Sequence, residues 1–212
     1  MDLSWNHNVH YHEHLLRHVP DSCVRALDVG CGTGRFARRL ASRAAQVEAI
    51  DPDPAMITEA RRRTPRRMGV HYVRAALDDF GIAPGAYQFV SAVASIHHMP
   101  FAESLRVLAR GLAPGGVLAV LGCYREQTPA DYAVSAAALL PQWSLGAGLR
   151  AARALTGVAD PTPAQGSGMP VREPDMGLAE IRAEAARVLP GVRVRRLLFW
   201  RYSLVYVRPL TG

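Results

Sequence analysis

The chain of 212 residues has no lysine, and its 25 basic residues are all arginines. A phosphate-binding loop that ends in Gly-Lys-Ser/Thr is therefore excluded. The 18 acidic residues leave a formal net charge of +7, which favours an anionic partner. Arginine in place of lysine, together with abundant alanine, is also typical of a GC-rich coding sequence, and we favour this explanation of the charge.

Cysteine and long apolar runs are scarce as well. The three cysteines, Cys23, Cys31 and Cys123, are too few for a disulfide framework. No apolar run is long enough to span a bilayer, and no secretory apolar segment opens the chain. Because 49% of the residues are apolar, the composition is that of a globular protein. We therefore expect one domain over residues 1–212, in the cytoplasm, as a monomer or homodimer.

The most informative stretch begins with the apolar run 26–29 and continues into Gly30, Gly32 and Gly34. Three glycines at alternate positions allow backbone conformations closed to other residues and remove side chains where a ligand approaches. A strand, a glycine turn and a helix in this order hold a nucleotide-like ligand at the carboxyl end of a sheet. The dinucleotide fingerprint requires Gly or Ala where this chain has Arg35, which disfavours NAD and FAD.

Asp28 followed by the pattern Gly-x-Gly-x-Gly resembles motif I of the class I S-adenosylmethionine (SAM)-dependent methyltransferases. A second resemblance lies at 95–99, Ser-Ile-His-His-Met, because UbiE-like small-molecule methyltransferases commonly carry a His-His pair there, facing the methyl group. The run Leu-Ala-Pro-Gly-Gly-Val-Leu at 112–118 is typical of the same family. The resemblance covers most of residues 25–122 and returns at 178–208.

The resemblance implies an α/β fold, with a doubly wound, mostly parallel seven-stranded sheet and an antiparallel C-terminal strand. It also implies SAM as the cofactor and S-adenosylhomocysteine as its product. Strands are expected over residues 26–29, 46–50, 70–73, 87–93, 117–121, 192–198 and 202–207. Helices are expected over residues 11–19, 55–63, 101–112 and 178–189. For the helix at 55–63, Asp53 is the expected N-cap and Pro54 the first helical residue.

The family pattern also indicates which residues contact the cofactor. They are Tyr11, Asp28, Gly30, Cys31, Gly32, Thr33, Gly34, Asp51, Pro52, Met56, Ala76, Leu77, Asp78 and Ser95. Asp51 ends the second strand, where one carboxylate can accept from both ribose hydroxyls. Met56 either lies against the adenine or packs in the core.

Ala76 is a departure from the family, which usually has an aspartate there to hold the adenine amino group. The Leu77 backbone amide and the Asp78 side chain are the expected substitutes. Adenine recognition is therefore the part of the cofactor site that the sequence defines least. The departure also keeps open an alternative function, a SAM-binding protein without transferase activity.

The two histidines His97 and His98 are the candidate catalytic residues. Methyl transfer needs a base only when the acceptor is a hydroxyl or a protonated amine, and imidazole suits that role. The alternative is that the pair only shapes the loop after the fourth strand. Side chains alternate along an extended segment, so we expect His98 to face the pocket and His97 to pack behind it.

Two basic segments suggest other functions. His10, His14 and His18 share one face of the N-terminal helix, which invites a metal site, but a polar surface is favoured and no metal is expected. The arginine run within 61–67 suggests an RNA methyltransferase. Interleaved aromatics, an appended RNA-binding module and the N/D-Pro-Pro-aromatic motif of base-methylating enzymes are all missing. Nucleic acid is therefore an unlikely partner.

Two further segments are expected to complete the site. Residues 1–20 should form a helix over the cofactor. Residues 123–190 are too many for one connecting helix and should form a helical insertion or lid, with Tyr124, Trp143 and Met169 lining the acceptor pocket. The expected function is methylation of a small molecule on oxygen, nitrogen or carbon, with secondary metabolism as its setting.

Overall fold

The computed structural model describes residues 7–129, 131–132, 134 and 174–210. Trp143, Met169 and most of the expected insertion lie outside these residues. The seven strands are β1 (Arg25–Val29), β2 (Gln46–Asp51), β3 (Val70–Arg74), β4 (Tyr87–Val93), β5 (Leu112–Cys123), β6 (Arg193–Arg196) and β7 (Arg201–Val207). The helices are α1 (His7–His10), α2 (His12–Leu16), α3 (Arg35–Leu40), α4 (Pro54–Arg63), α5 (Leu77–Phe80), α6 (Phe101–Gly111) and α8 (Leu178–Val188), with 3-10 turns η1 (Arg66–Met68) and η2 (Ile96–His98).

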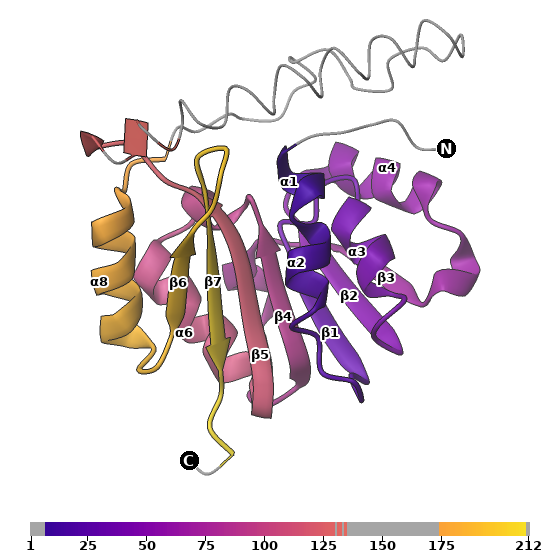
Figure 1. The fold of residues 1–212 in the computed structure, drawn as a ribbon. Helices are drawn as coiled ribbons and strands as arrows, with labels where there is room; N and C mark the ends of the chain where they lie inside the picture. The colour runs from indigo at the N-terminus through magenta and orange to yellow at the C-terminus, as the bar shows by residue number, and fades with distance from the viewer. Residues whose placement is uncertain (1–6, 130, 133, 135–173, 211–212) are drawn as a thin grey trace, which may run out of the picture.

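The strands form one sheet in the order β3-β2-β1-β4-β5-β7-β6 (Figure 1). Neighbours among β1 to β5 are parallel, whereas β7 runs antiparallel to both β5 and β6. The expected doubly wound sheet with one reversed strand is therefore confirmed. The strand order reverses between β1 and β4, and ligands of such sheets bind at the carboxyl ends beside this point.

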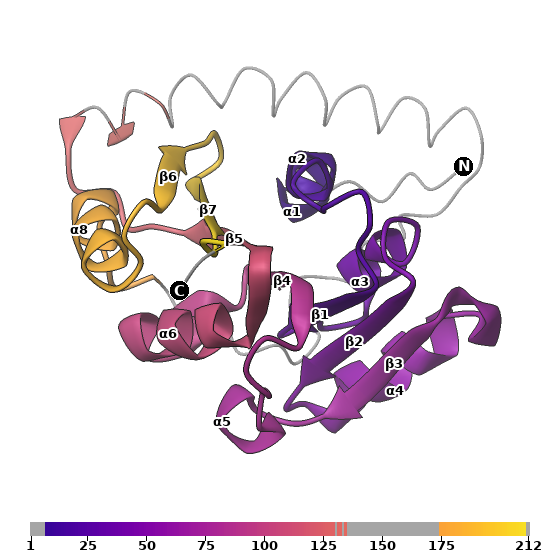
Figure 2. The same ribbon diagram turned by 90° about the horizontal axis from the view of Figure 1, so that it is seen from below.

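Helices cover both faces of the sheet, and alternate residues of β1 supply the two cores (Figure 2). Ala26 packs with α2, α3 and α4, whereas its neighbour Leu27 packs with α6 and α8. This alternation follows from the two-residue period of a strand. Burial on both faces explains why the central strands are almost continuously apolar.

The start of helix α4 follows the sequence prediction. The Asp53 side chain accepts a hydrogen bond from the Ala55 backbone N–H at 2.7 Å, and Pro54 is the first helical residue. A carboxylate in this position satisfies an N–H that has no partner within the helix. Helix α4 therefore begins directly after the carboxyl end of β2.

Two expected elements differ from the structure. The helix predicted over 11–19 is shorter in the structure, where α2 spans His12–Leu16 and the separate helix α1 precedes Tyr11, which has φ −94° and ψ 0°. Its hydroxyl donates to the Leu198 carbonyl in the β6–β7 turn, a long-range contact that local spacing does not reveal. The fifth strand begins earlier than predicted, at Leu112, and its pairing with β4 shifts register between Tyr87 and Phe89.

His12 should make the stability of the fold fall in acid. The side chain is 2% exposed and packs edge-on to Phe36, and burial, with the charges of Arg39 and Arg35, lowers the pKa of His12 to about 3. The unfolded chain then binds a proton below about pH 6.5 that the folded chain does not bind. From pH 7 to 5 the native protein should lose about 2 kcal/mol more than His12→Leu.

Urea unfolding at the two pH values measures this difference. His71→Leu is the matched control, because His71 lies exposed on β3. Equal pH dependence of the native protein and His12→Leu would contradict the prediction.

Candidate functional site

The glycine loop joins β1 to α3 at the carboxyl edge of the sheet. The backbone N–H groups of Gly30 and Cys31 donate to the Ile50 carbonyl at 2.8 and 3.0 Å, which ties the loop to the end of β2. Gly30, Gly32 and Gly34 have φ of 68°, 52° and 72°. These are left-handed conformations, which residues with a side chain rarely adopt.

Each glycine has a different environment. A Cβ on Gly30 would lie 2.3 Å from the Cβ of Ser95, and one on Gly34 would lie 2.2 Å from the Tyr72 hydroxyl oxygen. A Cβ on Gly32 would meet no atom within 4 Å. The first and third glycines therefore allow the loop to pack on Ser95, just after β4, and on Tyr72 of β3, while the second leaves open space.

Asp51 is the last residue of β2 and holds the turn of the glycine loop. One carboxylate oxygen accepts from the Gly32 N–H at 2.8 Å, and the other accepts from the Asp53 N–H at 2.9 Å. The side chain therefore fixes the loop and the start of α4 at the same time. Carboxylate oxygens have further lone pairs, which leaves acceptor capacity for a ligand.

Asp28 lies beneath the loop rather than on its surface. It is 1% exposed, and its Oδ1 accepts from the Ser91 hydroxyl at 2.8 Å. Burial raises the pKa of Asp28 to about 7; the Ser91 hydrogen bond opposes this shift, and the charge of Asp51 adds to it. Near neutral pH this buried carboxyl therefore takes up a proton readily.

The other expected cofactor residues are distributed around the same edge. Ser95 is buried and donates to the Val29 carbonyl at 2.7 Å. Ala76 precedes α5, where Leu77 is buried and Asp78 is exposed. Cys31, Thr33 and Met56 are half-buried, and Pro52 is exposed. The structure brings Ser95 and Asp51 to the glycine loop, whereas the Tyr11 hydroxyl reaches the β6–β7 turn.

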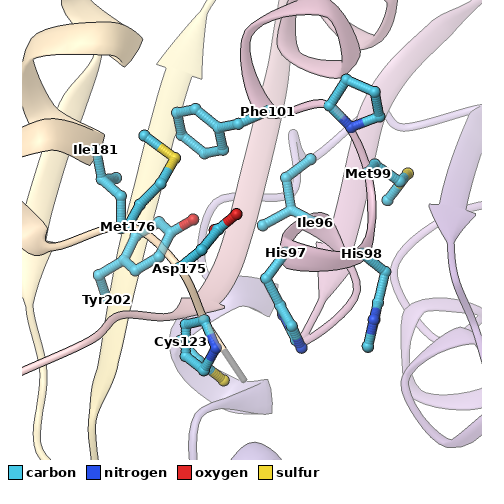
Figure 3. A pocket seen from close by; sticks show the side chains of 12 residues that line it. Ile96, His97, His98, Met99, Phe101, Cys123, Asp175, Met176, Ile181 and Tyr202 are labelled. Carbon is cyan, nitrogen blue, oxygen red and sulfur yellow. The ribbon is translucent and has the colours of Figure 1, made fainter. Parts of the chain in front are cut away.

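A cavity of about 270 Å³ lies beyond the end of β4 (Figure 3). Its walls come from η2 and the start of α6, the end of β5, the segment before α8, α8 itself and β7. The lining residues are Ile96, His97, His98, Met99, Pro100, Phe101, Cys123, Pro174, Asp175, Met176, Ile181 and Tyr202.

Both histidines line this cavity, so the expectation that one of them points away is wrong. The segment is a 3-10 turn and not an extended strand, so neighbouring side chains do not alternate between two faces. The rings of His97 and His98 lie with centroids 4.1 Å apart and planes tilted by 40°. His98 is exposed and His97 is half-buried.

The comparison with known proteins points to one family. A model described as a methyltransferase domain matches residues 26–116. An uncharacterised methyltransferase of Mycobacterium tuberculosis is 28% identical over 213 residues, covering 99% of this chain and 100% of that protein. A trans-aconitate 2-methyltransferase of Paracidovorax citrulli is 33% identical over 70% of this chain and 58% of its own length.

A solved structure from Listeria monocytogenes, described as an S-adenosylmethionine-dependent methyltransferase, agrees with these relatives. It shares 28% identity and a TM-score of 0.50, covering 55% of this chain and 54% of that chain. The chain is a class I SAM-dependent methyltransferase. SAM is its cofactor, and the sequence resemblance to this family is confirmed.

Two residues of the methyltransferase site gave no signal in the sequence. Tyr72 on β3 closes the underside of the glycine loop at Gly34, and Tyr202 on β7 lines the cavity beside Cys123. Both reach the site from strands that are distant in sequence. Tyr124, an expected pocket residue, is instead buried in the core below the guanidinium of Arg196.

Two further observations on the methyltransferase concern metal binding and membrane-spanning helices. Among the described residues, no group of three or more His, Cys, Asp or Glu side chains could hold a metal ion. The rings of His14 and His18 meet edge to face, with centroids 5.4 Å apart. In the same part of the chain, no helix has the length and apolar character needed to cross a membrane.

Packing at the first glycine can be tested by stability. Gly30→Ala should cost about 1–2 kcal/mol for the left-handed conformation, and a further ~1–3 kcal/mol for the clash with Ser95. Gly81→Ala is the matched control, because Gly81 has φ +65° and open space at its Cβ. Urea unfolding of both variants isolates the clash, and equal losses would contradict the packing account.

Proposed function

We propose that this methyltransferase transfers the methyl group of SAM to a small molecule bound in the cavity beside His97 and His98. The observation that carries the proposal is the position of this cavity. It lies beyond the end of β4, one residue past Ser95, and Ser95 touches the glycine loop. A ligand on the loop and a ligand in the cavity would therefore be neighbours.

The cofactor side of the proposal rests on the glycine loop. The open space at Gly32 is a cradle for the ligand, and the spare lone pairs of Asp51 would accept from the ribose hydroxyls. Adenine would lie near Ala76, with the Leu77 amide and Asp78 as its polar contacts. Bound SAM would supply an activated methyl group on a sulfonium centre.

Transfer is an in-line displacement at the methyl carbon. The acceptor atom forms a bond to that carbon as the carbon–sulfur bond breaks, and the electron pair stays on sulfur to give S-adenosylhomocysteine. The protein contributes by aligning the two reactants and by excluding water. The cavity walls from α8 and β7 serve that purpose.

His98 is the proposed base for an acceptor that must lose a proton. It lines the cavity and is also exposed, so it could take a proton from the acceptor and release it to solvent. His97, whose half-buried ring lies tilted against it, would hold its ring in place. The reacting atom would be oxygen, nitrogen or carbon.

The arginine run supports a small-molecule acceptor over RNA. Arg62 and Arg63 both pair with Glu59, at 2.6 and 2.5 Å, and Arg61 donates to the Tyr72 carbonyl at 2.7 Å. Glu59 therefore offsets part of this positive charge, and the Arg61 guanidinium is held against the protein's own backbone. A relative named for trans-aconitate supports the same class of acceptor, and the proposed setting is secondary metabolism in the cytoplasm.

Gly32→Val tests the cofactor site. A branched side chain would fill the cradle, so calorimetric titration should detect no SAM binding to the folded variant. Gly191→Val is the matched control, because Gly191 also has a positive φ and open space, in the turn before β6. Unchanged SAM affinity of Gly32→Val would remove the glycine loop as the binding site.

His98→Ala tests the transfer step. With radiolabelled SAM and a panel of alcohols, phenols, amines and carboxylic acids, the native protein should methylate at least one class. His98→Ala should lower the rate on a hydroxyl acceptor by about 10²–10⁴-fold and leave SAM affinity unchanged. A rate near the native one would eliminate the base role. SAM binding without transfer to any acceptor would favour a binding protein over an enzyme of small molecules.

A further inference from the structure

Tyr202 is a buried tyrosine in the wall of the cavity, on the side away from the two histidines (Figure 3). It lies on β7, next to the last residues of strand β5, and only 1% of the residue is exposed. The family motifs do not involve this strand. Its position nevertheless brings a phenol group to the place where the acceptor is proposed to bind.

Gly122 explains how the phenol reaches that place. It pairs directly with Tyr202 across β5 and β7. A Cβ on Gly122 would lie 2.2 Å from Cζ of Tyr202 and 2.4 Å from its hydroxyl oxygen. Gly122 is not among the glycines with positive φ, so the glycine is required by the tyrosine ring and not by the backbone. The space beside this glycine therefore sets the position of the hydroxyl.

The hydroxyl of Tyr202 differs from those of other buried tyrosines. Tyr11, Tyr72 and Tyr87 are hydrogen-bonded to Leu198, Thr64 and Glu48 respectively.

For Tyr202 the structure gives no hydrogen bond among the described residues. Some side-chain oxygen and nitrogen atoms of the described residues are fully buried and have no hydrogen-bond partner, among them the hydroxyl oxygen of Tyr124. The hydroxyl oxygen of Tyr202 is not one of these fully buried atoms. The Tyr202 hydroxyl is therefore open to the cavity that it lines.

The chemical state of this phenol is also defined. Burial raises the pKa of Tyr202, and the neighbouring Cys123 acts in the same direction. The group is therefore a neutral O–H donor at physiological pH. A ligand that fills the cavity takes this donor away from water, so a ligand that accepts its hydrogen bond is selected over one that does not.

We infer that Tyr202 is a specificity-determining residue that donates a hydrogen bond to an oxygen atom of the methyl acceptor. This rests on the proposed function, which puts the acceptor in the cavity. Oxygen is the expected partner because an aliphatic amine is protonated at neutral pH and has no lone pair to accept. The acceptor class is therefore one with a carbonyl, carboxylate or hydroxyl group toward β7 and its reacting atom toward the histidines.

Three rigid probes test this without methyl transfer. Cyclohexanone, cyclohexylamine and methylcyclohexane have similar size, and their binding to the protein saturated with S-adenosylhomocysteine can be measured by ligand-observed NMR. The native protein should bind cyclohexanone most tightly. Tyr202→Phe removes only the hydroxyl and should weaken cyclohexanone at least about tenfold, with little change for the other two probes.

Two further variants keep the test specific. Tyr124→Phe removes a buried hydroxyl that does not line the cavity, so it should leave all three affinities unchanged. Gly122→Ala should displace the phenol and reproduce the loss of cyclohexanone affinity, with no added loss in the double variant with Tyr202→Phe. Thermal unfolding confirms that each variant is folded.

The outcomes separate this inference from the proposed function. The role of Tyr202 would be overturned by any of three results. The native protein could show no preference for cyclohexanone, Tyr202→Phe could bind cyclohexanone as tightly as the native protein does, or Tyr202→Phe could lose affinity for cyclohexylamine instead. Failure of the native protein to methylate any acceptor would overturn the proposed function, while the probe result still reports on the hydroxyl.

Discussion

The hydrogen bonds from the Gly30 and Cys31 N–H groups to the Ile50 carbonyl hold the whole site in place. They join the ends of β1 and β2, and the Asp51 carboxylate completes the connection by binding the Gly32 N–H. Parallel pairing then sets β4 level with β1, so that Ser95 meets the loop. A slip in this register would separate the glycine loop from the residues that face it.

Glycine has two different uses in this protein. In the loop, positive φ angles require it at all three positions, and close packing requires it again at Gly30 and Gly34. In β5 the backbone of Gly122 has no positive φ, and the missing side chain makes room for the ring of Tyr202. The loop glycines shape the proposed cofactor site, and Gly122 makes room for a ring in the wall of the proposed acceptor cavity.

Sequence predictions that depend on interactions between neighbouring residues were accurate, and those that depend on contacts between distant residues were less so. The strand at 87–93 and the capped start of α4 were predicted correctly, because periodicity and capping act over a few residues. The helix predicted at 11–19 is shorter in the structure, and local spacing did not reveal that Tyr11, the residue before its first turn, is bonded to Leu198. The orientation of His97 was wrong because a 3-10 turn replaced the expected extended segment.

The sequence by itself determined the fold class, the order of strands and helices along the chain, and the methyltransferase family. These depend on local patterns, and Asp28 with its three glycines and the His97–His98 pair are such patterns. Only the tertiary structure decided that Tyr202 lies across Gly122 and that both histidines share one cavity with it. The pairing of β7 with β5 joins residues 80 positions apart in the chain, and no local propensity encodes a contact of that range.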